Sequence, residues 1–115
     1  PIGAISNIVA LKFENCQIRN LGLFKYLKNL KQLSLEANNI QDISCLKEVT
    51  QLEFLSLQNN PITDFSALTH LTNTTIELSF NQKFNLKELQ ENNIQVIITF
   101  NNNFHQYDET FFQNN

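Results

Sequence analysis

The chain has 115 residues, which is enough for one small domain, and its 42% apolar content allows a buried core and excludes a wholly disordered chain. The net charge of −3 at pH 7 does not favour binding to DNA or RNA. No apolar run approaches the roughly 18 residues that a membrane-spanning helix needs.

The start of the chain and its cysteines bear on location. Residues 1–4 lack the basic and apolar regions of a signal peptide, and the missing initiator methionine indicates a processed or excised chain. A targeting segment removed earlier would leave the same sequence. Cys16 and Cys45 form no CxxC pair and indicate neither a disulfide framework nor a zinc site. We therefore expect a reducing, cytoplasmic or nuclear location.

A short segment recurs through the chain at a nearly constant spacing. Residues 33–40, LSLEANNI, recur as residues 55–62, LSLQNNPI, after 22 residues. Related segments lie one step before and at two further steps, so that five copies extend over about residues 8–103. We expect a single domain with repeats at 8–29, 30–51, 52–72, 73–94 and 95–103, followed by a C-terminal cap at 104–115.

Each copy contains a short strand with alternating faces. Leu33 and Leu35 point inwards, whereas Ser34 points to solvent. One repeat cannot bury its apolar side alone, so stacked repeats pair their strands as a parallel sheet. The expected inward columns are Leu11, Leu33, Leu55, Ile76 and Ile98, and Phe13, Leu35, Leu57, Leu78 and Phe100.

The repeat resembles a known family. Residues 30–40 and 52–62 match the leucine-rich repeat pattern L-x-x-L-x-L-x-x-N-x-L. Residues 42–46 and 64–68, DISCL and DFSAL, resemble the 22-residue subclass found in a regulatory subunit of protein phosphatase 1 and in bacterial internalins. The resemblance implies an α/β solenoid, a right-handed horseshoe with a parallel sheet on its concave face and short 3₁₀ or irregular turns on its convex side.

The resemblance also implies a ladder of asparagines that bond to the backbone of the turns after the strands. Inward-facing amides carry donors and acceptors that must be satisfied. Cys16 stands in this place in the first repeat, where we expect a structural rather than a reactive thiol. The expected members of the ladder are Asn38, Asn60, Asn81 and Asn103.

The segments between the strands are predicted to differ along the chain. Residues 41–51 and 63–73 should follow the convex side, with Ser44 and Ser66 as caps of short helical turns. Eleven residues leave no room for a long helix, which favours 3₁₀ turns. In the fourth repeat, residues 85–92 have helical spacing, and we expect a helix there followed by a strand at 95–100.

Aromatic residues gather after the last repeat. The four are Phe104, Tyr107, Phe111 and Phe112. We interpret them as a cap over the open end of the core, which terminal repeats require. The alternative is a patch on which a neighbouring domain or subunit packs.

Patterns typical of catalysis or metal binding are missing from the sequence. His70 and His105 are the only histidines, and neither stands in an HxxxH or HExxH spacing. The sequence contains neither a P-loop nor a nucleophile elbow. We expect no enzyme activity, no cofactor and no metal.

The outward strand positions form the expected contact surface. Phe54 is an aromatic residue at such a position in a middle repeat, which makes it a candidate hot spot, and Phe80 is a second. The alternative is that neighbouring side chains cover both rings. The expected partner-binding residues are Lys12, Ser34, Glu36, Phe54, Ser56, Gln58, Glu77 and Phe80.

These features predict a non-catalytic module that binds a protein partner through its concave face. The alternatives are a phosphatase regulatory subunit, an internalin-like surface adhesin and a structural segment of a larger protein. Residues 12–31 hold five basic residues against Glu14 alone, whereas residues 32–115 carry a net charge of −7. One interpretation is that this charge asymmetry orients a charged partner. The alternative is that the basic residues form an ordinary solvent-exposed surface.

Overall fold

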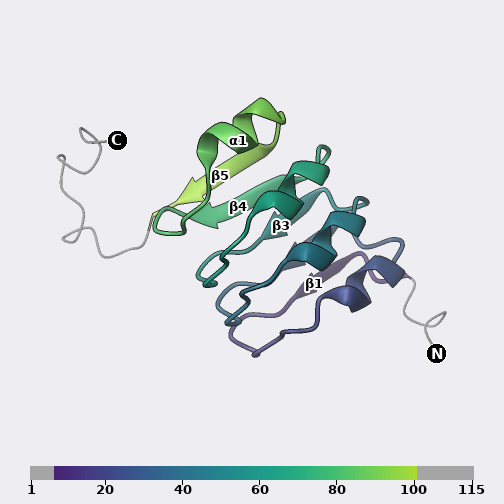
Figure 1. Ribbon diagram of the computed structural model, residues 1–115. Helices are drawn as coiled ribbons and strands as arrows, with labels where there is room; N and C mark the ends of the chain where they lie inside the picture. The colour runs from purple at the N-terminus through teal and green to yellow at the C-terminus, as the bar shows by residue number, and fades with distance from the viewer. Residues whose placement is uncertain (1–6, 101–115) are drawn as a thin grey trace.

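The computed structural model describes residues 7–100, in which five short strands alternate with three 3₁₀ helices and one α-helix. Figure 1 shows the strands side by side in one layer and the helical segments stacked in another. In chain order the elements are β1 (Ala10–Lys12), η2 (Gly22–Tyr26), β2 (Gln32–Ser34), η3 (Ser44–Glu48), β3 (Phe54–Ser56), η4 (Ser66–His70), β4 (Thr75–Ser79), α1 (Leu86–Glu91) and β5 (Gln95–Thr99).

The strands form one parallel sheet in the order of the sequence. The sheet runs β1-β2-β3-β4-β5, and each strand pairs with its neighbours in the chain. Leu11, Leu33 and Leu55 lie side by side on the first three strands, and Ile76 continues the row on β4. The predicted parallel sheet and the short 3₁₀ turns are confirmed.

The inward strand residues stack into a continuous core. Leu11 and Phe13 of the first repeat are only partly buried but pack against the same core. Burying a leucine or isoleucine fully contributes about 1.5–3 kcal/mol, so the middle repeats contribute more than the first. The completely buried residues at the inward positions of the second, third and fourth repeats are Leu33, Leu35, Leu55, Leu57, Ile76 and Leu78.

The last strand pairs in a register that differs from the expected one. Ile76 pairs with Val96, and Leu78 pairs with Ile98. The last step of the sheet is therefore 20 residues, and the prediction that Ile98 and Phe100 end the two columns is wrong. The step also places Ile97, an exposed residue, beside Glu77.

The shorter step has a physical cause in the helix that precedes β5. Helix α1 ends in a Schellman turn, in which Asn93 adopts a left-handed conformation (φ 61°) and Ile94 N donates to Leu89 O at 2.9 Å. This turn leads the chain directly back to the sheet. The predicted helix at 85–92 is confirmed to within one residue at each end, with Asn85 Oδ1 accepting from Glu88 N at 3.1 Å.

The predicted amide ladder is present in the middle repeats. Asn60 Oδ1 accepts from Asn38 N at 2.8 Å and from Ile40 N at 3.0 Å, and Asn60 Nδ2 donates to Leu35 O at 2.8 Å. Both asparagine side chains are buried. Each amide therefore satisfies buried backbone groups of the repeat before it, where water has no access.

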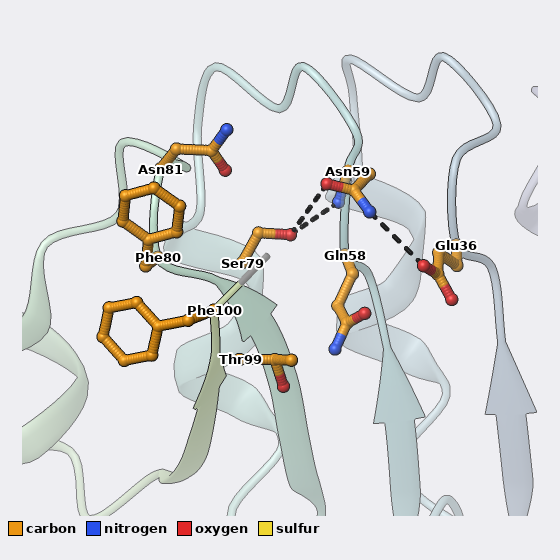
Figure 2. A pocket seen from close by; sticks show the side chains of 8 residues that line it. All are labelled: Glu36, Gln58, Asn59, Ser79, Phe80, Asn81, Thr99 and Phe100. Atoms are coloured by element: carbon orange, nitrogen blue, oxygen red, sulfur yellow. Dashed lines mark hydrogen bonds between the residues drawn. The ribbon is translucent and has the colours of Figure 1, made fainter. Parts of the chain in front are cut away.

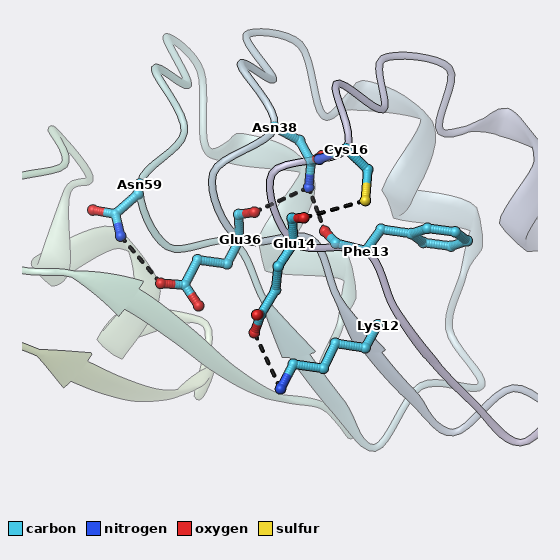
Figure 3. A network of polar contacts seen from close by, with 7 residues as sticks. All are labelled: Lys12, Phe13, Glu14, Cys16, Glu36, Asn38 and Asn59. Carbon is cyan, nitrogen blue, oxygen red and sulfur yellow. Dashed lines mark hydrogen bonds and ion pairs between the residues drawn. The ribbon is translucent and has the colours of Figure 1, made fainter.

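The first repeat receives the same support from Asn38. Its Oδ1 accepts from Cys16 N at 2.8 Å, and its Nδ2 donates to Phe13 O at 2.6 Å, as Figure 3 shows. The Cys16 thiol is exposed and donates to Glu14 O at 3.2 Å. The hydrogen bond of the thiol therefore lies within its own turn. Unlike the ladder asparagines, Cys16 bonds to no earlier repeat among the described residues.

In the fourth repeat Gln82 supplies the side-chain amide, and the expectation that Asn81 does so is wrong. Gln82 Nε2 donates to Leu57 O and to Asn60 O, both at 2.9 Å. Strand β4 continues to Ser79, whose N–H donates to Gln82 Oε1 at 2.7 Å. Because β4 is longer than β3, the amide that bonds to the preceding repeat stands at residue 82, one position after the expected Asn81, and belongs to the longer side chain of glutamine. Asn103 and the repeat end at residues 101–103 lie outside the described residues.

Carboxylates, and not the expected serine side chains, cap η3 and η4. Asp42 Oδ1 accepts from Ser44 N at 2.8 Å, and Asp64 Oδ1 accepts from Ser66 N at 2.9 Å. The prediction for Ser44 and Ser66 is wrong by two positions, because an Asx turn places the acceptor ahead of the helix. In the first repeat Asn20 Oδ1 accepts from Gly22 N at 3.1 Å. The backbone bonds lower the pKa of both aspartates below their usual 3.8.

We expect Gln82→Ala to lower the free energy of unfolding by about 1–2 kcal/mol, because it removes the acceptor of Ser79 N and one of the donors to Leu57 O and Asn60 O. The matched change Asn81→Ala removes an exposed amide and should stay within about 0.5 kcal/mol of wild type. Urea unfolding followed by circular dichroism measures both. A larger loss for Asn81→Ala would contradict the assignment of the ladder position.

We expect the two aspartates to make the fold sensitive to acid. Their folded pKa lies below the ordinary value, so they stabilise the fold above that value and lose this contribution as the pH falls through the lowered pKa. In the Asp42→Asn, Asp64→Asn double variant an amide oxygen can still accept the backbone hydrogen bond, as that of Asn20 does. The Tm of this variant should fall less on acidification than that of wild type. Glu53→Gln is the control, and an unchanged pH profile in the double variant would disprove the effect.

Candidate functional site

The outward side chains of the strands form a largely polar surface, which we call the outer sheet face. Phe54 lies near its middle, between Gln32 of β2 and Thr75 of β4, and is half-buried. The outer sheet face comprises the strand residues Ala10, Lys12, Gln32, Ser34, Phe54, Ser56, Thr75, Glu77, Ser79, Gln95, Ile97 and Thr99, together with Glu36, Gln58 and Phe80, which follow the strands.

A hollow of about 410 Å³ lies over the first part of this face. It extends from β1 to β4 and is bordered by Ala10 and Gln32 in addition to the expected residues. Six of the eight expected partner-binding residues line it. They are Lys12, Ser34, Glu36, Phe54, Ser56 and Glu77.

A second hollow, of about 210 Å³, lies where the strands end, as Figure 2 shows. Glu36, Gln58 and Phe80 from the expected set line it, together with Asn59, Ser79, Asn81, Thr99 and Phe100. Because Glu36 borders both hollows, they adjoin each other. The structure therefore brings all eight expected residues to one continuous surface.

The expected residues differ in how much surface they offer. Ser56 and Gln58 are buried, at 3% and 9% exposed, and form the floor of the hollows. Glu36, Glu77 and Phe54 are half-buried, so that part of each side chain remains accessible. The last three are therefore better placed than Ser56 and Gln58 to contact a partner.

Phe80 forms part of an aromatic wall. Its ring stacks on that of Phe100, with ring centres 5.2 Å apart and planes 23° apart. Phe80 N also donates to Thr99 O at 3.1 Å, which ties the residue to β5. The ring is half-buried and thus lies between full exposure and complete cover by its neighbours.

A hydrogen-bonded series holds Glu36 in place. Asn59 N donates to Ser79 Oγ at 2.8 Å, and Ser79 Oγ lies 3.3 Å from Asn59 Oδ1. Asn59 Nδ2 then donates to Glu36 Oε1 at 3.3 Å (Figures 2 and 3). Nothing in the sequence alone marked Asn59 as part of the site. Asn59 stands 22 residues after Ala37, and both residues adopt a left-handed turn conformation. The repeat spacing was therefore the one sequence feature that could have placed Asn59 in this turn.

Other candidate groups bear less on function. His70 lies on η4 and is exposed, whereas His105 and the four C-terminal aromatic residues lie outside the described residues. Within residues 7–100, histidine, cysteine and acidic side chains form no group of three that could hold a metal ion. No helix in that range has the length and apolar character to cross a membrane.

Comparison with known proteins identifies similar repeats. A family model described as leucine rich repeat matches residues 8–62. Internalin C2 from Listeria monocytogenes is similar with a TM-score of 0.71 and 30% identity, over 88% of this chain and 45% of internalin C2. Internalin F from the same species is similar with a TM-score of 0.63 and 25% identity, over 86% of this chain and 32% of internalin F. The chain thus spans less than half of either internalin. A search of curated protein sequences found no significant match.

We expect Ser79→Ala to lower the free energy of unfolding by about 1 kcal/mol, because the change removes the acceptor of Asn59 N in a mostly buried position. Ser34→Ala, on the same face, should stay within about 0.5 kcal/mol of wild type. Urea unfolding of the two variants measures the difference. Equal losses would show that the Ser79–Asn59 contact does not hold the turn.

Proposed function

Because the chain belongs to the leucine-rich repeat proteins, with repeats like those of internalins, we propose that it binds a protein partner through the outer sheet face, the concave surface of the solenoid. This fold is typical of protein-interaction modules, and its family is typically non-catalytic. The chain spans less than half of the similar internalins, so the proposal concerns this domain alone.

The observation that supports the proposal is the position of Phe54. Its ring lies half-buried in the middle of a hollow of about 410 Å³ whose other lining side chains are largely polar. An aromatic anchor surrounded by polar groups is the arrangement in which a few residues carry most of the binding energy. Glu36, which borders both hollows, is the second contact of the proposed site.

Among the other expected functions, an internalin-like surface adhesin is favoured by the likeness to internalin C2 and internalin F. The two proposals differ in location, since an adhesin is exported and an interaction module of the cytoplasm or nucleus is not. A secretion signal encoded upstream in the same gene would support the adhesin.

We expect Phe54→Gln and Glu36→Gln to reduce binding of the partner without harming the fold. Both changes copy the repeat itself, because Gln32 and Gln95 stand at the position of Phe54, and Gln58 stands at that of Glu36. Loss of a central aromatic contact typically costs about 2 kcal/mol or more, which is about thirtyfold in affinity. Affinity capture from a lysate of the source cells, read by mass spectrometry, identifies a protein that wild type retains and the variants lose.

The control is Lys47→Thr, on the opposite side of the solenoid, where the next repeat has Thr69. This variant should retain the partner as wild type does, and circular dichroism should show all variants folded. Equal capture by wild type and the Phe54→Gln, Glu36→Gln double variant would contradict the use of the outer sheet face.

A further inference from the structure

The hollow around Phe54 carries more negative than positive charge. Three carboxylates line it, those of Glu14, Glu36 and Glu77, against the single cation of Lys12. Lys12 Nζ lies 3.2 Å from Glu14 Oε1, so these two charges compensate each other. Glu36 and Glu77 are left as the net charge of the hollow.

Neutral donors hold both of these carboxylates. Glu36 accepts from Asn59 Nδ2 at 3.3 Å, and Glu77 Oε2 accepts from Thr99 Oγ1 at 3.0 Å. In the part of the chain that the structure describes, neither glutamate forms an ion pair. The three ion pairs found there are Lys12–Glu14, Lys25–Glu48 and Lys87–Glu91.

The rim of the face does not compensate this charge. Lys31 and Glu53 directly precede β2 and β3 and contribute one charge of each sign. The net charge of the hollow therefore remains that of Glu36 and Glu77. An acidic segment or a nucleic-acid phosphate would meet repulsion here, whereas a cationic group would gain attraction that the protein itself does not supply.

The sheet fixes where these charges stand relative to the aromatic ring. Glu36 follows β2 and Glu77 lies in β4, on either side of the strand that carries Phe54. Two strand spacings separate β2 from β4, and Glu36 stands two residues beyond Ser34, the residue level with Glu77, so the two backbone positions are roughly 12 Å apart. An extended peptide covers this distance in about three to four residues.

From this arrangement, and resting on the proposed function, we infer that the partner contributes a basic segment to the outer sheet face. An apolar side chain of the segment packs against Phe54, and two lysines or arginines about three to four residues apart pair with Glu36 and Glu77. A cation in this hollow also lies within reach of the Phe54 ring, whose face attracts positive charge.

A display library of random 12-residue peptides, selected on the immobilised protein, tests this inference even while the natural partner is unidentified. We expect the selected peptides to be enriched in lysine or arginine near an apolar residue, relative to the unselected library. A synthetic peptide from the selection, measured by fluorescence anisotropy at 50 mM and 250 mM NaCl, should bind more weakly at the higher salt concentration.

Isosteric variants then test the two carboxylates. Glu36→Gln and Glu77→Gln remove the charge but keep an oxygen acceptor for Asn59 and Thr99, and each should weaken the peptide about two- to fivefold at 50 mM NaCl. Glu91→Gln, on α1, removes an exposed carboxylate elsewhere and should leave the affinity unchanged.

The outcomes separate this inference from the proposed function. Acidic or uncharged peptides that bind, and that Phe54→Gln loses, would overturn the basic segment but support the outer sheet face as the binding surface. Failure to enrich any peptide would overturn the inference and leave the proposed function to the capture experiment. Self-association of the purified chain that the Glu36→Gln, Glu77→Gln variant abolishes would assign the face to a second copy and also overturn it.

Discussion

The inward side chains of each strand gain cover only when the strands on both sides are in place. Leu33 on β2 and Leu35 directly after it are completely buried, whereas Leu11 on β1, at the edge of the sheet, and Phe13 directly after β1 are only partly buried. Burial in this molecule is therefore a property of neighbouring repeats and not of any single one. The same stacking fixes the outward side chains at regular positions, which is how Phe54, Glu36 and Glu77 come to share one surface.

Much of this arrangement could be predicted because it depends on period alone. The nearly constant spacing of the apolar residues was enough to predict the parallel sheet and the row from Leu11 through Leu33 and Leu55 to Ile76. Helical spacing within residues 85–92 predicted the helix there. The eight residues that the sequence suggested for the site line two adjoining hollows. The neighbouring residues Asn59 and Asn60 have separate structural roles, since Asn59 adopts the left-handed turn conformation and Asn60 bonds to the preceding repeat.

The parts that could not be predicted depend on local geometry that a period does not contain. The shift of the ladder amide to Gln82 follows from the length of β4, and the register of β5 follows from the Schellman turn at Asn93. The capping carboxylates stand two residues ahead of the expected serines because Asx turns reach forward. For the candidate site, sequence position predicted that Ser56 and Gln58 point outwards but gave no measure of how deeply their neighbours bury them.

The amide ladder has a direction, since each turn is completed by the side chain of the following repeat. Asn38 bonds to the turn of the first repeat, and Asn60 bonds to Asn38 N, 22 residues earlier. As the chain leaves the ribosome from its N-terminus, each turn must wait for the next repeat before its buried backbone groups find partners. Folding during synthesis therefore runs one repeat behind elongation. Removal of all repeats after a given point leaves the last remaining turn without its side-chain partner, whereas removal of the repeats before that point leaves every remaining turn with its partner.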